Sequence, residues 1–96
     1  MGYAVMGTII LKGDISVNES NEAIGSLNCA LDRNLTTLPV EDGTGILLSA
    51  IKEEQDMELF LYNIDEFLTD FEPIITRYDI TVYDLNDAYS ETRQSD

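Results

Sequence analysis

The chain of 96 residues carries nineteen acidic side chains, five basic ones and no histidine, which gives a formal net charge of −14 at pH 7. That length allows one domain with one modest hydrophobic core. A negative charge of this size repels nucleic-acid phosphates and anionic lipid, so the composition disfavours direct binding to nucleic acid or to a membrane and favours a basic partner.

The cysteine content and the first residues bear on the compartment. The single cysteine, Cys29, cannot close an internal disulfide, which fits a reducing environment. Residues 1–11 lack the basic start of a secretion signal, and their apolar run is too short to span a bilayer. We therefore expect a cytoplasmic protein.

The first predicted element is a strand over residues 3–12. Its residues are apolar on both alternating sets, which is typical of a strand in the middle of a sheet. Gly13 and Asp14 then break the pattern, and Ser16 with Glu19 forms a candidate capping box for a helix that we expect to reach about Arg33. Asn34 suits the left-handed position that ends many helices.

Two strands are predicted next. Residues 35–40 contain Pro39, which cannot complete a hydrogen-bond ladder on both sides, so we expect an edge strand there. Asp42 and Gly43 lie in a segment that predicts a tight turn. Residues 46–52 are again apolar on both sides, which predicts a second central strand.

An acidic amphipathic helix is predicted over residues 53–77. Asp56 is its expected N-cap, and Pro73, which lies inside the pattern, is expected to kink the helix because Ile75 and Tyr78 keep the helical phase. The apolar residues that recur at helical spacing, and that we expect to be buried, are Met57, Phe60, Leu61, Ile64, Phe67, Leu68, Phe71 and Ile75.

The last predicted strand covers residues 79–85, where Ile80 and Val82 alternate with Thr81 and Tyr83 as in a half-buried strand. Residues 86–96 have no periodicity and are expected to form an acidic, mobile tail. The order β-α-β-β-α-β predicts a single compact α+β domain over residues 1–85. We expect a ferredoxin-like four-stranded antiparallel sheet with two helices on one face. Apolar residues on the uncovered face of that sheet favour a homodimer through this face.

No residue pattern predicts catalysis or a cofactor. Asp14, Ser16 and Asn18 open like a calcium loop, but Glu19 and Gly25 stand where that loop needs glycine and glutamate, so we expect no metal site. Cys29 has no histidine to activate it. We therefore predict that the protein is not an enzyme.

The outer face of the acidic helix is the candidate partner-binding site. Eight acids and no base fall between Glu53 and Glu72, so the Glu/Lys pairs that usually stabilise a surface helix are absent. An apolar and an aromatic residue lie among these acids, as in a protein-binding hot spot. The predicted site residues are Glu58, Leu59, Tyr62, Asp65, Glu66 and Asp70.

These features favour an inhibitor that occupies a basic, nucleic-acid-binding surface of its target. In size, acidity and lack of a catalytic motif the chain is similar in type to phage anti-defence proteins, including anti-CRISPR and anti-restriction DNA mimics, which act in the host cytoplasm. An immunity protein against a basic nuclease toxin has the same physical profile. A small regulatory ligand-binding module, with a pocket beside Gly13 and Asp14, is the alternative from another class. A third alternative is a structural subunit whose acidic surface serves solubility alone.

Overall fold

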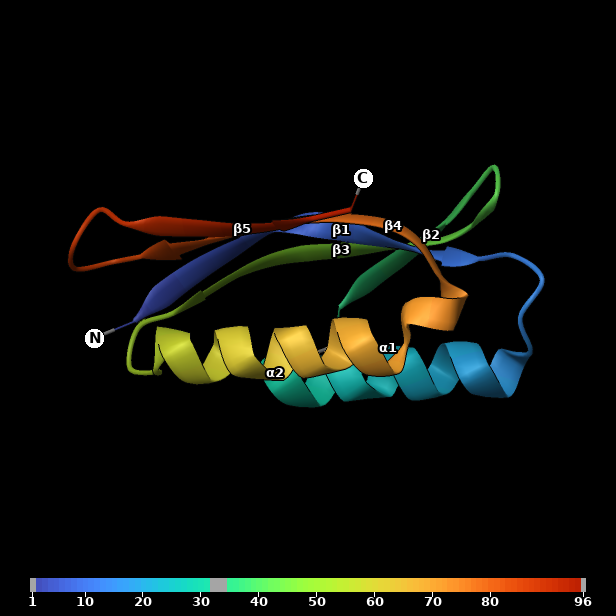
Figure 1. Ribbon diagram of the computed structural model, residues 1–96, viewed down its shortest axis with the longest axis horizontal. Helices are drawn as coiled ribbons and strands as arrows, with labels where there is room; N and C mark the ends of the chain where they lie inside the picture. The colour runs from blue at the N-terminus through green and yellow to red at the C-terminus, as the bar shows by residue number, and fades with distance from the viewer. Residues whose placement is uncertain (1, 32–34, 96) are drawn as a thin grey trace.

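The computed structural model describes residues 2–31 and 35–95, which form a sheet layer and a helix layer. Figure 1 shows both helices on the same face of the sheet, as predicted. The elements in chain order are β1 (Tyr3–Lys12), α1 (Val17–Leu31), β2 (Thr36–Val40), β3 (Gly43–Lys52), α2 (Met57–Asp70), a 3₁₀ turn η1 (Glu72–Ile74), β4 (Ile75–Asp84) and β5 (Ser90–Gln94).

The sheet has five antiparallel strands in the order β2-β3-β1-β4-β5. β1 pairs with β3 along its whole length, from Tyr3 opposite Lys52 to Lys12 opposite Gly43. The prediction that these two strands are neighbours inside the sheet is confirmed, and β2 is an edge strand as Pro39 predicted. The expected number of four strands is wrong, because a fifth strand extends the sheet beyond β4.

The fifth strand, β5, lies in the segment that the sequence assigned to a mobile tail. It pairs with β4 from Ser90 opposite Tyr83 to Gln94 opposite Asp79. Just beyond it, the backbone nitrogen of Ser95 donates to the carbonyl of Tyr78 over 2.9 Å. β5 contains no apolar residue, so its hydrophobicity pattern gave no signal, and pairing with the backbone of β4 holds it in place.

The core lies between the sheet and the helices. Alternate residues of the three long strands point toward the helices, and α2 buries the predicted stripe from Met57 to Leu68 against them. Gly7 lies on this inner side, where a Cβ would come 2.1 Å from the carbonyl oxygen of Asp79. The strand residues of the core are Tyr3, Val5, Ile9, Leu11, Ile46, Leu48, Ala50, Ile80 and Val82.

The capping box at the start of α1 forms in part. The Ser16 hydroxyl oxygen accepts a hydrogen bond from the backbone nitrogen of Glu19 over 3.1 Å, as predicted. The Glu19 carboxylate, however, accepts from the Ser16 hydroxyl over 3.2 Å, where the reciprocal bond of a full capping box would come from the Ser16 backbone. The predicted helix end near Arg33 and Asn34 lies outside the described residues.

The end of α2 differs from its prediction. The helix does not continue through Pro73 with a kink: it ends at Asp70, Pro73 lies in η1, and Ile75 begins β4. Proline has no backbone N–H to donate and disfavours helical geometry at the residue before it, here Glu72. Ile75 pairs with Leu11 in the sheet, so its helical phase in the sequence was misleading.

The start of α2 gives a direct test of its cap. The Asp56 carboxylate accepts a hydrogen bond from the backbone nitrogen of Glu58 over 2.9 Å, which confirms the predicted N-cap. We expect Asp56→Ala to lower the free energy of unfolding by about 1 kcal/mol, because this helix-end donor loses its partner, while Asp56→Asn keeps the cap. Urea unfolding measures both. Equal stability of the alanine variant and the wild type would show that the cap is not stabilising.

Candidate protein-binding face on helix α2

The six predicted partner-binding residues lie together on the solvent side of α2, because the apolar stripe turns the opposite side toward the sheet. We call this set the α2 outer face. The side chain of Leu59 is 58% exposed and that of Tyr62 is 60% exposed. The face consists of Glu58, Leu59, Tyr62, Asp65, Glu66 and Asp70, all of them exposed.

A hydrogen bond fixes the aromatic residue of this face. The Tyr62 hydroxyl donates to Glu66 Oε1 over 3.0 Å, one helical turn along. This bond and the negative charge of Glu66 raise the pKa of Tyr62 above its ordinary value. The phenol of Tyr62 therefore stays protonated, and its bond to Glu66 restricts the orientation of the exposed ring. A partner that contacts the ring loses less conformational entropy in fixing it.

The titration of Tyr62 tests this bond. We expect Glu66→Gln to bring the pKa of Tyr62 down toward the ordinary value, because the variant removes the acceptor charge that favours the protonated phenol. Glu58→Gln removes the same charge at the same spacing on the other side of Tyr62 and is the matched control. An NMR titration of the Tyr62 ring measures both variants. Equal shifts in the two variants would contradict a specific Tyr62–Glu66 bond.

An ion pair that the sequence did not predict changes the charge of the α2 outer face. Arg93 of β5 donates from Nε to Asp65 Oδ1 over 2.7 Å and from Nη2 to Asp65 Oδ2 over 3.2 Å. The hydrogen bond to Asp65 raises the pKa of Arg93. Among the described residues, no ion pair compensates Glu58, Glu66 or Asp70, so these three carry the net charge of the face.

A groove of about 300 Å³ joins this face to α1. Its walls are Ser26, Cys29 and Ala30 from α1 and Asn63, Glu66, Phe67 and Asp70 from α2. Three small residues of α1 therefore lie opposite two acids of the α2 outer face, Glu66 and Asp70. A partner that covers this face also reaches the groove.

The thiol of Cys29 is exposed at this groove. We expect Cys29→Ser to leave the affinity for a partner unchanged, because serine keeps the small size of the wall and no described histidine or metal cluster gives the thiol a chemical role. Binding of wild type and variant to the same captured partner, with circular dichroism to check folding, measures this. A weaker complex of a fully folded variant would show that the thiol itself makes a contact.

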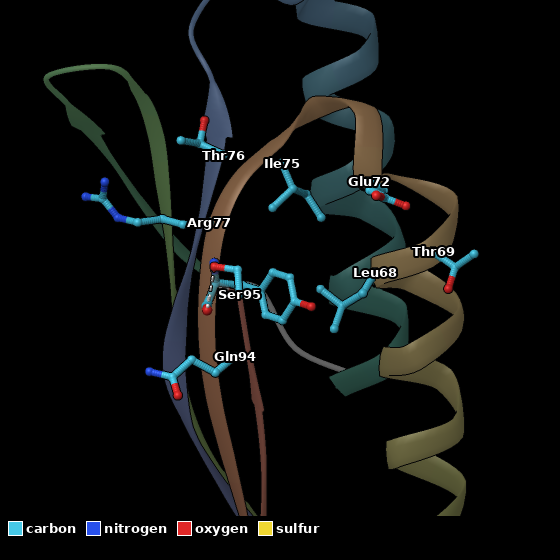
Figure 2. Close-up of a pocket in the computed structure, with 9 residues that line it drawn as sticks. Leu68, Thr69, Glu72, Ile75, Thr76, Arg77, Gln94 and Ser95 are labelled. Carbon is cyan, nitrogen blue, oxygen red and sulfur yellow. Dashed lines mark hydrogen bonds between the residues drawn. The ribbon is translucent and has the colours of Figure 1, made fainter.

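A second hollow, of about 420 Å³, lies where α2 passes through η1 into β4. Its polar side chains do not converge: Figure 2 shows Arg77 and Gln94 pointing away from the hollow, and Glu72 on the helix side. Leu68 and Ile75 point into the space between the strand and the helix. The residues that line this hollow do not include Gly13 or Asp14, the pair at which the sequence placed a ligand pocket.

No protein-family model, curated protein or solved structure matches the chain. The candidate function therefore rests on the chemistry of the α2 outer face itself.

In the described residues no helix is long and apolar enough to cross a membrane.

Proposed function

We propose that this protein is a small acidic inhibitor that binds a basic, nucleic-acid-binding surface of its target through the α2 outer face. We also propose that β2-β3-β1-β4 and the two helices form a ferredoxin-like unit that β5 extends. The observation that carries the functional proposal is the placement of Leu59 and Tyr62, exposed and surrounded by acids, on a helix whose other side is fixed in the core.

The physical basis is the combination of charge and an aromatic anchor. Three uncompensated acids attract a basic surface over a long range and align it before contact. The exposed Tyr62 ring, held by Glu66, then loses contact with water in the complex, as aromatic hot-spot residues do. The net charge of −14 adds to the attraction.

The acids of the α2 outer face do not form a continuous row of negative charge. α2 has 14 residues, so it is about 21 Å long at about 1.5 Å per residue. Arg93 neutralises Asp65 in the middle of this length, so Glu58 stands apart from Glu66 and Asp70. We propose that the face occupies a phosphate-binding surface through two acidic ends and a central anchor, not as a continuous copy of a strand.

Phage anti-defence proteins of the anti-CRISPR or anti-restriction type fit this proposal, since their targets are basic enzymes or complexes in the host cytoplasm. An immunity protein that covers a nuclease toxin would use the same surface. The two differ in the target, so identification of the captured protein separates them.

Capture with paired baits tests the proposal. The first altered bait carries Asp65→Lys, Glu66→Lys and Asp70→Lys on the α2 outer face. The second carries Asp14→Lys, Glu41→Lys and Asp42→Lys, all exposed residues in the turns at the ends of β1 and β2. Each bait changes the net charge from −14 by the same six units, to −8. Because the two baits have the same net charge, a difference between them shows the effect of where the charges lie on capture of the target.

We expect the wild type and the turn variant to retain the same basic, nucleic-acid-binding protein from a bacterial lysate, and the α2 variant to lose it. The three acids of the turns do not neighbour Tyr62. Their reversal should therefore weaken only the long-range attraction to the target. If both altered baits lose the protein equally, net charge alone drives the capture. If both keep it, the α2 outer face is not the binding site.

A further inference from the structure

The face of the sheet that the helices do not cover is the second surface of interest. Figure 1 shows no described helix or strand over it. By the strand registers, alternate residues of β1, β3 and β4 point to this side. We call it the open sheet face. Its larger exposed apolar side chains are Met6, Leu38, Leu47, Ile51 and Tyr83, and Ile10 lies among them but is buried.

The charges of the open sheet face differ from those of the rest of the molecule. Among the described strand residues, the registers place three charged side chains here: Lys12, Arg77 and Asp79. Their sum is +1, in a chain with a net charge of −14. The acids therefore lie mostly elsewhere, on the helices, turns and loops and on the helix-facing side of β4 and β5. Two copies that meet through the open sheet face bring few acids together.

The open sheet face has a hollow beside projecting apolar side chains, a shape that a second copy of the same face can match. A hollow of about 490 Å³ lies over β1 and β3, lined by Ala4, Met6, Ser49 and Ile51 with the backbone between them. Met6 is 58% exposed and Ile51 is 65% exposed, so two projecting apolar side chains adjoin the small Ala4 and Ser49. An isologous interface requires this kind of self-complementary surface, in which a projecting side chain of one copy enters the hollow of the other across a two-fold axis.

The available area lies near the lower end of what a specific interface buries. β1, β3 and β4 have ten residues each, and β2 and β5 have five each. At about 3.3 Å per residue and about 4.8 Å between strands, the face covers on the order of 600 Å² before the relief of its side chains is counted. Standard protein interfaces bury about 800 Å² per partner.

We infer that the protein forms a homodimer in which the open sheet faces of two copies pack against each other. This arrangement points both α2 outer faces outward, so it is independent of the proposed inhibitory function. Two acidic copies repel each other through the solvent, so the dimer should tighten as salt rises from about 0.01 M to about 0.15 M. Binding to a basic target should weaken over the same range, which separates the two proposals.

Sedimentation velocity on the full chain between about 1 μM and about 1 mM tests the dimer. We expect the mass to rise from 10.7 kDa toward twice that value, about 21 kDa. Ile51→Lys or Met6→Lys should weaken dimerisation by about tenfold or more, because each puts a charge into the apolar contact. Leu59→Lys, on α2 and equally exposed, is the control and should leave it unchanged.

A second readout uses the unaltered protein. The methyl resonance of Met6 should shift on dilution, while that of Met57, which is buried in the core, should not. A mass of 10.7 kDa throughout the range, with a constant Met6 signal, would overturn the inference and leave the face to another partner. A dimer that Ile51→Lys and Leu59→Lys affect equally would overturn it too, because the contact would then lie elsewhere.

Discussion

Phe60→Ala is expected to bring the domain close to unfolding. Phe60 is 2% exposed, and its ring stacks on Tyr3 of the central strand with 4.9 Å between centroids. Truncation of a buried phenylalanine costs about 3–5 kcal/mol. Small domains have a total stability of about 5–15 kcal/mol, so the loss removes a large part of it and should lower Tm by on the order of 20 °C.

The neighbouring residue is the matched control. Leu59→Ala removes a similar side chain from the same turn of α2, but Leu59 faces solvent, so its effect should stay within about 0.5 kcal/mol. Calorimetry or urea unfolding measures both variants. Equal losses of stability would mean that the buried side of α2 is assigned wrongly, and the α2 outer face with it.

The parts of the fold that the sequence predicted correctly are those with periodic burial or a local cap. The stripe from Met57 to Leu68 repeats at helical spacing, and Asp56 precedes it directly, so both signals lie within a few residues of the structure they predict. The alternation of Ile80 and Val82 against Tyr83 likewise predicted the buried side of β4. Each of these patterns arises from the buried side of a single helix or strand, so it can be recognised within a short stretch of sequence.

The features that the sequence missed depend on contacts between distant segments. β5 has no buried apolar residue, and its strand geometry comes from the unpaired edge that β4 offers. The Arg93–Asp65 pair joins residues 28 positions apart, through a strand that was not predicted. The one available signal was that Glu91 and Arg93 share one side of an extended segment, which would have pointed both toward the same neighbour.

Reversal of three acids on the α2 outer face is expected to have the largest effect on binding. For the captured target, Asp65→Lys, Glu66→Lys and Asp70→Lys together should slow association by about tenfold or more at about 0.01 M salt. The effect should shrink at about 0.15 M, because the Debye length falls from about 30 Å to about 8 Å. Stopped-flow or surface-based kinetics at the two salt concentrations measure it.

The triple variant should remain folded. The Arg93–Asp65 pair is partly exposed to solvent, so its loss costs at most about 1 kcal/mol. Lysine in place of Asp70 lies in the last turn of α2, where a positive charge favours the helix dipole by about 0.3–1 kcal/mol. Tyr62→Ala is the complementary variant, and it should act by hastening dissociation, since an anchor holds a complex that has already formed.

The most direct measurement is a competition between this protein and nucleic acid for the same target. The target is first loaded with a fluorescently labelled nucleic acid that it binds, and the wild-type protein is then added while anisotropy is followed. We expect the protein to displace the nucleic acid completely, and the variant with Asp65→Lys, Glu66→Lys and Asp70→Lys to need a much higher concentration to do so. A target that holds both at once, each with unchanged affinity, would contradict it.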